Sequence, residues 1–375
     1  MVWQKAPPNS LNPFISKERI LIMAKKTPAR PQQQTSHLPQ GHPPVPPQKV
    51  GVLYVNLGTP DNTGYFAMRR YLKEFLSDRR VIDLNPVLWS LLLNVIILTK
   101  RPFTSGHAYK TIWNTKEDES PLLTFTKAQC KKLQEKMKAE KPGVECAWAM
   151  RYGNPSIAKG IDELRAKGCQ KILLFALYPQ YSAPTSATVY DKAFDHLKTL
   201  KWQPAIRTVP SYHDHPAYIQ ALANSVQAHV KTLSWTPDLT IASFHGVPKR
   251  YLLEGDPYHC FCQKTGRLLR EKLGIPAQKW LLSFQSRFGT EEWLKPYTDK
   301  ELIERTQQGK VKNVLILAPG FVADCIETLE ELNIRLREDF MAAGGKNFSY
   351  VPCLNSTPDG IDVLAQVTLN ELSGW

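Results

Sequence analysis

The chain has 375 residues, of which 42% are hydrophobic, and it carries a formal net charge of +14 at neutral pH. This length allows one large domain and favours two of ordinary size. A charge this high would suggest a nucleic-acid partner, but residues 1–49 contribute +6 of it because they hold seven Lys or Arg against one Glu. The remainder is only moderately basic and has no RNA- or DNA-binding motif, so the sequence argues against a nucleic-acid partner.

Residues 1–49 are predicted to form a disordered tail, because they are rich in Pro, Gln and Lys and poor in residues that build a core. They lack the apolar stretch of a secretory signal, while their scarcity of acidic residues is compatible with a transit peptide. A second methionine opens the segment Met23-Ala-Lys-Lys. We expect translation to start there, which N-terminal sequencing of the native protein would test.

Ordered structure is predicted to begin at Val50. Residues 51–57 have the composition of a strand, and Gly58-Thr59-Pro60 would turn the chain away from it. Residues 65–76 have the spacing of a helix. Residues 87–98 then form an apolar run of twelve residues. Spanning a bilayer takes about 20 residues, so this run is predicted to be either a core helix or a segment lying at a membrane surface.

Beyond residue 125 strands and helices alternate, which predicts a parallel sheet with right-handed crossovers. Residues 146–149 are a predicted strand. Asn154 is the predicted N-cap of the next helix, with Pro155 at its first position and Gly168 at its end. Further strands are predicted over residues 172–177, 239–244, 281–286 and 314–318.

The second half of the chain repeats the first. Leu57-Gly58-Thr59-Pro60 corresponds to His245-Gly246-Val247-Pro248, and Arg151-Tyr152-Gly153 corresponds to Arg287-Phe288-Gly289. We therefore predict two similar doubly wound, Rossmann-like α/β domains, residues 50–208 and 209–356, with a cleft between the carboxyl ends of their sheets. Residues 357–375 are expected to form a helix that packs back on the first domain. The apolar run 87–98 lies in an insertion of the first half.

An acidic row follows the strand at 314–318. Asp324, Glu327 and Glu331 are spaced by three and then four residues, so a helix would carry them on one face, where they could hold a metal ion or exchange protons. A simpler interpretation is that Asp324 caps the helix with Glu327 at its third position, because acidic residues suit the positive end of a helix dipole. His245 ends a strand of the same half. An isolated His is more often structural, but ligands bind at such strand ends.

Several well-known motifs are missing from the sequence, which argues against the functions that depend on them. It has no Gly-x-Gly-x-x-Gly, Walker A, Gly-x-Ser-x-Gly or His-Glu-x-x-His motif, so nucleotide binding, serine hydrolysis and zinc proteolysis lose support. The seven cysteines include no Cys-x-x-Cys pair and are predicted to be reduced thiols of a cytosolic protein. His259-Cys260-x-Cys262 is a weak candidate metal site without a second pair of ligands. A histidine, a carboxylate row and aromatic strand ends remain, and these suit a large flat ligand that meets a cation.

The sequence resembles the ferrochelatase family, whose members insert Fe(II) into a porphyrin. The motifs that carry the resemblance lie within residues 50–372, at residues 56–60, 178–182, 243–248, 254–258, 284–287 and 319–329. The resemblance implies insertion of Fe(II) into protoporphyrin IX with release of two protons, which forms protohaem in the last step of haem synthesis.

The resemblance also implies residue roles. His245 and Glu327 would be the catalytic pair that contacts the metal, with Asp324 and Glu331 extending an acidic path. The residues implied to line the porphyrin site are Leu57, Arg101, Tyr109, Ser120, Tyr152 and Trp293. Residues 84–105, hereafter the lip, would be the apolar entrance for a membrane-soluble porphyrin. The expected location is the cytoplasm, with the lip as the candidate for peripheral contact with the inner face of the membrane.

Two departures from the family pattern refine these expectations. Some members hold a 2Fe–2S cluster with cysteines, three of them in a C-terminal extension, whereas this chain has only Cys353 beyond the acidic row. We therefore expect no cluster and no other tightly bound cofactor, as in bacterial members. Leu57 stands where relatives acting on coproporphyrin have tyrosine, which favours protoporphyrin IX. A chelatase for coproporphyrin or for another metal, and a non-catalytic porphyrin carrier, remain alternatives; the sequence gives no indication of oligomeric state.

Overall fold

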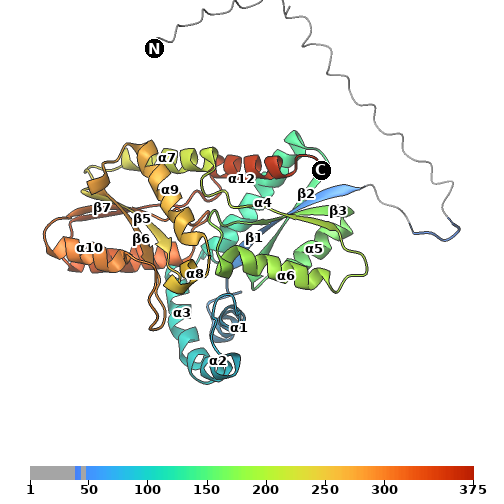
Figure 1. Ribbon diagram of the computed structural model, residues 1–375, viewed down its shortest axis with the longest axis horizontal. Coiled ribbons are helices and arrows are strands. Elements are labelled where there is room, and N and C mark those ends of the chain that lie inside the picture. The colour runs from blue at the N-terminus through green and yellow to red at the C-terminus, as the bar shows by residue number, and fades with distance from the viewer. Residues whose placement is uncertain (1–38, 44–47) are drawn as a thin grey trace, which may run out of the picture. The chain divides into compact units, whose positions relative to one another are not determined.

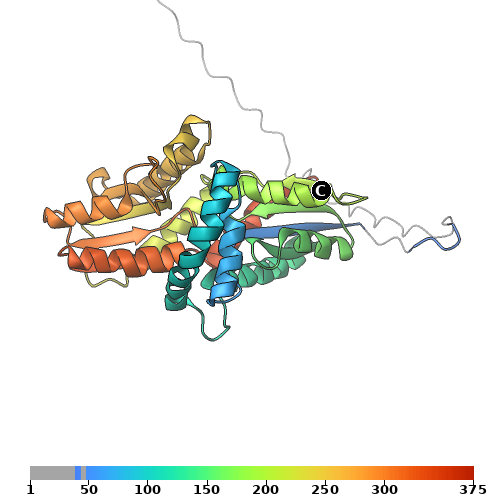
Figure 2. The ribbon, with the colours of Figure 1, turned by 90° about the horizontal axis from the view of Figure 1, so that it is seen from below.

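The computed structural model describes residues 39–43 and 48–375, so the candidate start at Met23 and nearly all of the predicted tail lie outside the described residues. The described residues from 48 onward belong to one compact unit. This unit contains two sheets of four strands each, with helices on both faces of the sheets (Figures 1 and 2).

The first sheet has the strand order β2-β1-β3-β4, and all its pairings are parallel. Its central strand β1 is apolar and fully buried from Val52 to Val55, as a strand covered on both faces must be. The strands are β1 (Lys49–Gly58), β2 (Val144–Tyr152), β3 (Cys169–Ala176) and β4 (Ala205–Thr208). The helical segments between these strands, besides those described below with the lip, are α4 (Pro121–Glu140), α5 (Ile157–Ala166), η4 (Ala183–Ala187) and α6 (Thr188–Leu197).

The second sheet has the order β6-β5-β7-β8, again parallel throughout. Because β5 to β8 take the places of β1 to β4, the predicted repeat and the predicted doubly wound fold are confirmed. The strands are β5 (Leu239–His245), β6 (Trp280–Gln285), β7 (Asn313–Leu317) and β8 (Asn347–Val351). The helical segments of this half are α7 (Pro216–Val230), α8 (Lys249–Leu253), α9 (Tyr258–Leu273), η5 (Ala277–Lys279), α10 (Thr298–Gln307), η6 (Glu327–Leu336) and α11 (Arg337–Ala342).

The two sheets share one apolar core. A single cluster of buried side chains includes Val52 and Leu173 from the first sheet and Leu315 and Val351 from the second. The last helix, α12 (Pro358–Glu371), packs against both α4 and α7. The hydroxyls of Tyr54 in β1 and Thr368 in α12 lie 3.0 Å apart in a buried hydrogen bond. This continuous packing fixes the second sheet relative to the first.

The helix α5 begins later than the sequence predicts. Its N-cap is Ser156, whose hydroxyl accepts the N–H of Lys159 at 3.3 Å. The Asn154 side chain instead donates to Asp61 at 2.9 Å. The predicted Asn154 cap is therefore wrong, because that amide is used in a tertiary contact and a serine two residues later supplies the cap.

The lip belongs to a continuous helical run that extends beyond both sheets (Figure 1). It follows α1 (Tyr65–Leu76) and consists of α2 (Pro86–Leu92), the short π-helix η3 (Leu93–Ile97) and α3 (Leu98–Ile112). Together these 27 residues are long and apolar enough to cross a membrane, judged by length and composition alone, and only 22% of the most apolar window is buried. The helix does not end at Lys100, so its length alone does not exclude a span, and the interpretation as a core helix or a membrane-surface segment stays a prediction.

Candidate functional site

His245 is the last residue of β5, and its backbone pairs with Gln285 of β6. Its ring Nδ1 lies 2.7 Å from the carbonyl oxygen of Gly246. Because that oxygen is only an acceptor, Nδ1 carries the hydrogen, and the neutral imidazole presents its lone pair at Nε2. The carbonyl of His245 accepts the Tyr258 hydroxyl at 3.0 Å, which fixes the end of the strand.

The turns after β1 and β5 both require glycine. Gly58 has φ +119°, and a Cβ there would lie 1.8 Å from the carbonyl oxygen of Tyr152. A Cβ at Gly246 would lie 2.7 Å from the carbonyl oxygen of Gln285 and 3.1 Å from the ring of Trp293. Trp293 therefore lies against the turn that follows His245. Its indole N–H donates to the carbonyl of Phe288 at 2.9 Å.

The acidic row does not share one helical face. The helix begins at Ile326 and continues from Glu327 as the π-helix η6, without a side-chain N-cap. Asp324 precedes it, so both the one-face prediction and the capping interpretation are wrong for Asp324. Glu327 and Glu331 remain together, because residues four apart lie on one side of a π-helix, in which hydrogen bonds join residues five apart. Such helices are frequent at functional sites.

Glu327, Glu331 and His245 are close enough to interact electrostatically. Burial raises the pKa of Glu331, and the negative charge of Glu327 raises it further. A hydrogen bond from Ser286 and the charges of His245 and Arg335 act in the opposite direction. The net effect is a carboxyl that takes up a proton more readily than an exposed glutamate.

The end of β6 supports these two glutamates. The Gln285 side chain donates to the backbone carbonyl of Glu327 at 2.8 Å, and the Ser286 hydroxyl donates to the Glu331 carboxylate. Ser286 has φ +64°, a left-handed conformation that costs energy for a residue other than glycine and that occurs often at functional sites. Sequence patterns did not identify either residue as part of the site, because their roles depend on the pairing of β6 with β5.

Asp324 is buried and its carboxylate is occupied by donors. Oδ1 accepts the hydroxyls of Thr328 at 3.0 Å and Tyr350 at 2.7 Å, and Oδ2 accepts the Asn355 side chain at 2.6 Å. Only 3% of the residue is exposed. The structure thus gives Asp324 a set of internal partners, and its part in an acidic path stays a prediction.

The residues expected to line the porphyrin site differ in whether their side chains are buried, packed against neighbours or already hydrogen-bonded within the protein. Leu57 packs between the cluster that contains the lip residues and the loop before η6. Tyr109 is buried; burial raises its pKa, and the charge of Glu327 raises it further. Ser120 is the N-cap of α4, where it accepts the N–H of Leu123 at 3.2 Å.

Arg101 and Trp89 bring the lip against the second half of the chain. The Arg101 guanidinium lies 5.3 Å from the ring centroid of Phe288, and the Trp89 ring meets the same ring edge-on at 6.5 Å. Burial lowers the pKa of Arg101, whereas the nearby charge of Glu331 raises it. The lip therefore lies over the loop after β6 with a cation near the acidic row.

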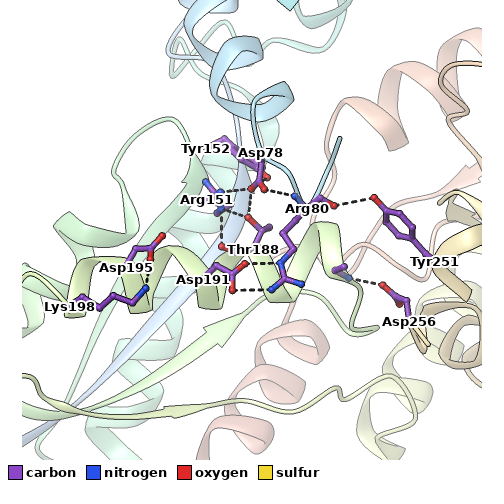
Figure 3. A network of polar contacts seen from close by, with 11 residues as sticks. Asp78, Arg80, Arg151, Tyr152, Thr188, Asp191, Asp195, Lys198, Tyr251 and Asp256 are labelled. Atoms are coloured by element: carbon purple, nitrogen blue, oxygen red, sulfur yellow. Dashed lines mark hydrogen bonds and ion pairs between the residues drawn. The ribbon is translucent and has the colours of Figure 1, made fainter. Parts of the chain in front are cut away.

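Tyr152 is held by a polar network that could not be predicted from sequence patterns (Figure 3). Its hydroxyl donates to Asp78 at 2.8 Å, and the same carboxylate accepts from Arg151 and Thr188. Arg80, two residues after Asp78, makes two hydrogen bonds to Asp191 at 2.7 and 3.2 Å. The network joins the end of α1 to β2 and α6, so it fixes the root of the lip.

Two buried hydroxyls near the site lack hydrogen-bond partners, and the described residues do not form a complete metal site. Within residues 39–43 and 48–375, the buried hydroxyls of Thr59 and Tyr178 have no hydrogen-bond partner, and no three His, Cys, Asp or Glu side chains converge as a metal site would require. Cys260 is exposed while Cys262 is buried, so these two do not form the weak candidate metal site. His245 and the glutamates therefore present an incomplete ligand set to any cation.

Comparison with known proteins places the chain in a family context. The family described as Ferrochelatase matches residues 49–372. A ferrochelatase of Allorhizobium ampelinum is 55% identical over 340 residues, which cover 91% of this chain and 98% of that protein. One of Rhodobacter capsulatus is 53% identical over 341 residues, covering 90% and 97%. Among solved structures, SirB from Bacillus subtilis with Fe3+ has a TM-score of 0.51 at 12% identity, covering 86% of this chain and 96% of that one, which supports the fold alone.

Proposed function

The chain belongs to the ferrochelatase family and is a metal chelatase, and on this premise we propose that it inserts Fe(II) into protoporphyrin IX and forms protohaem. The observation that carries the proposal is that the charges of His245 and Glu327 both act on Glu331, while Nδ1 of His245 is hydrogen-bonded to Gly246 and leaves Nε2 for a ligand. Leu57 at the equivalent end of β1 supplies an apolar wall.

The reaction needs a base and a route for a cation. A free-base porphyrin carries two pyrrole protons, which a dication must displace. His245, whose Nδ1 is hydrogen-bonded to Gly246, can accept a proton at Nε2. Glu331, whose pKa is raised mainly by burial, can take up a proton in turn. The two glutamates also lower the cost of bringing Fe(II) out of water into a partly buried site.

The incomplete ligand set suits a metal that is a substrate. His245 and Glu327 supply two contacts, and the remaining positions of the iron are available to the porphyrin nitrogens. We therefore propose that the iron is passed to the macrocycle and that the protein keeps no resident cofactor. A purified protein with an iron–sulfur absorption band would contradict the second part of this proposal.

The surroundings fit a flat ligand with acidic side chains. Leu57, Tyr109 and Trp293 offer apolar and aromatic surface, and Arg101 offers a guanidinium suited to a carboxylate. Tyr152 and Ser120 already use their hydroxyls inside the protein, so we propose that they shape the wall of the site. The Thr59 and Tyr178 hydroxyls are the better candidates for polar contact with substrate.

We further propose that the protein is cytoplasmic and touches a membrane peripherally through the lip. Val87 is 76% exposed, Leu88 69% and Leu91 65%, so the outer side of α2 presents a continuous apolar surface. Val87→Asp with Leu91→Asp should lower co-sedimentation with lipid vesicles, whereas Met341→Asp, at an exposed apolar position of α11, should not. Resistance of the native protein to alkaline extraction would instead indicate a membrane-spanning helix.

The central test is an anaerobic assay of the purified protein with protoporphyrin IX and Fe(II), in which loss of porphyrin fluorescence measures turnover. His245→Ala and Glu327→Gln should lose most turnover and still bind porphyrin, while the control variants His196→Ala in α6 and Glu338→Gln in α11 should keep both. Turnover retained in both site variants would place the chemistry elsewhere. Binding without turnover in the wild type would favour a carrier, and faster turnover of coproporphyrin or of another metal would favour a different chelatase.

A further inference from the structure

We propose that Asn355 is a positioning residue for metal insertion, which fixes the loop that leads into η6 and thereby the place of Glu327. Asn355 lies after β8, in a loop that contacts the loop between β7 and η6. The inference rests on the proposed function, because it assumes that Glu327 acts on the metal. It assigns a role to a residue that touches neither the porphyrin wall nor the expected metal.

The Asn355 side chain binds Asp324 at two points. Its Oδ1 accepts the backbone N–H of Asp324 at 2.8 Å, and its Nδ2 donates to Asp324 Oδ2 at 2.6 Å. A primary amide is the side-chain group that offers an acceptor and a donor side by side in this way. Both residues are buried, so these hydrogen bonds are shielded from competing water.

The backbone of Asn355 is held from two further sides. Its N–H donates to the carbonyl of Val322 at 2.9 Å, and its carbonyl accepts the Gln129 side chain of α4 at 2.9 Å. Its φ is +51°, in the left-handed region, where asparagine is found more readily than most other residues. Asn355 therefore links α4, whose N-cap is Ser120, to the loop before η6.

The connection from Asp324 to Glu327 is short. Asp324 Oδ1 accepts the Thr328 hydroxyl at 3.0 Å, and the Thr328 Oγ1 accepts the N–H of Cys325 at 3.0 Å. These contacts flank Glu327 in the chain, where it is the first residue of η6, a segment without a side-chain cap. If the Asn355 amide is lost, the first turn of η6 loses its anchor and Glu327 can shift.

The Asp324 carboxylate that Asn355 binds lies among three titratable side chains. The titratable side chains facing it are Tyr350 from β8, Cys353 from the loop after β8 and Cys325 from the loop before η6. Burial raises the pKa of each of the three, so all are neutral near pH 7. A neutral amide donor at Asn355 thus completes the partners of Asp324 without adding charge.

Two variants separate the amide from the backbone requirement. Asn355→Gly keeps the left-handed conformation and removes the amide. Asn355→Asp keeps an acceptor for the Asp324 N–H but puts a second carboxylate where the donor was. Both variants should fold by circular dichroism and bind protoporphyrin IX within about threefold of wild type. Their kcat for Fe(II) insertion should fall by at least about tenfold, because a displacement near 1 Å can cost about a hundredfold.

The pH dependence of the aspartate variant gives a readout that a merely structural role would not change. Two adjacent carboxylates favour sharing one proton, and the shared proton restores the missing donor. The ratio of the kcat of Asn355→Asp to that of wild type should therefore rise as the pH falls, whereas the ratio for Asn355→Gly should stay constant. Asn224→Asp is the matched control, since Asn224 donates to Asp359 at 2.8 Å on the exposed surface of α7, and its kcat should equal that of wild type.

The outcomes separate this inference from the proposed function. Wild-type kcat in folded Asn355→Gly would overturn the positioning role, and so would a loss of porphyrin binding in proportion to kcat. If the Asn355 variants keep full turnover while Glu327→Gln is inactive, the positioning role fails and the proposed function stands. If the wild type shows no turnover, or Glu327→Gln keeps it, the proposed function fails first.

Discussion

Removal of the Asp78 carboxylate should destabilise the protein more than any surface ion pair could. The side chains of Asp78 and Arg151 are 8% and 10% exposed, so Asp78→Ala would leave a buried guanidinium whose remaining acidic neighbour is Glu74, at 3.9 Å. Breaking one side of a buried pair costs about 3–5 kcal/mol. The Tyr152 and Thr188 hydroxyls would also lose their acceptor (Figure 3). We expect the free energy of unfolding, measured by urea titration at neutral pH, to fall by about 3–5 kcal/mol.

The pH dependence tests the electrostatic part of this prediction. Burial alone would raise the pKa of Asp78, but hydrogen bonds from Thr188 and the Arg80 N–H and the charge of Arg151 lower it below its ordinary value. A lowered pKa gives stability that is present above the unfolded-state pKa and is lost as the pH falls through the folded-state pKa. The difference between wild type and Asp78→Ala should therefore shrink below about pH 4.

A matched variant at the surface completes the test. Asp195 pairs with Lys198 three residues later, and both side chains are mostly exposed, at 67% and 73%. Such pairs contribute little, so Asp195→Ala should leave the unfolding transition unchanged. If Asp78→Ala and Asp195→Ala had equal effects, or if Asp78→Ala cost less than about 1 kcal/mol, the reasoning from burial would be refuted.

Two further predictions concern the site itself. Burial and the charge of Glu327 raise the pKa of Glu331, so the contribution of Glu331 to stability should decrease as the pH rises above the ordinary carboxyl value. Glu331→Gln should therefore gain stability relative to wild type as the pH is raised above about 4 in urea titrations, and a constant difference would contradict this. Gly58→Ala should lower the free energy of unfolding by at least about 3 kcal/mol, because φ is +119° and the new Cβ would meet the Tyr152 carbonyl. In the same urea titration, Gly143→Ala should lower it by only the backbone strain of about 1 kcal/mol, because φ is +93° and nothing lies within 4 Å of the new Cβ.

The sequence predicted the fold well because its signals are local and repeated. Buried parallel strands are short apolar runs, and each predicted strand was found within a few residues of its place. The predicted repeat of the two halves is seen in the strand order, since β5 to β8 occupy the positions of β1 to β4. The helix boundaries were less secure. The cap moved from Asn154 to Ser156 because side chains far away in sequence competed for the asparagine.

The site was only partly predictable, for the same reason. The spacing of Asp324, Glu327 and Glu331 assumed an α-helix, but the loop before η6 and its π geometry separate Asp324 from the other two. The donors around Asp324 come from β8 and the loop after it, and no sequence window contains both sides of these contacts. Ser286 likewise reaches Glu331 only because β6 pairs with β5. Spacing identifies candidates, while tertiary pairing decides which of them stay free to react.

The two halves show how one backbone arrangement supports different chemistry. β1 and β5 end in equivalent glycine turns, and each turn packs closely against the end of the neighbouring strand. At the last position before the turn the first half has Leu57 and the second has His245. An apolar side chain there can contact a ligand but cannot exchange a proton with it, whereas imidazole at the same position can. The acidic helix also belongs to the second half, so we infer that the first half holds the ligand and the second half reacts with it. Exchanging the residues, as Leu57→His with His245→Leu, should therefore abolish turnover, because the acids would no longer lie beside the base.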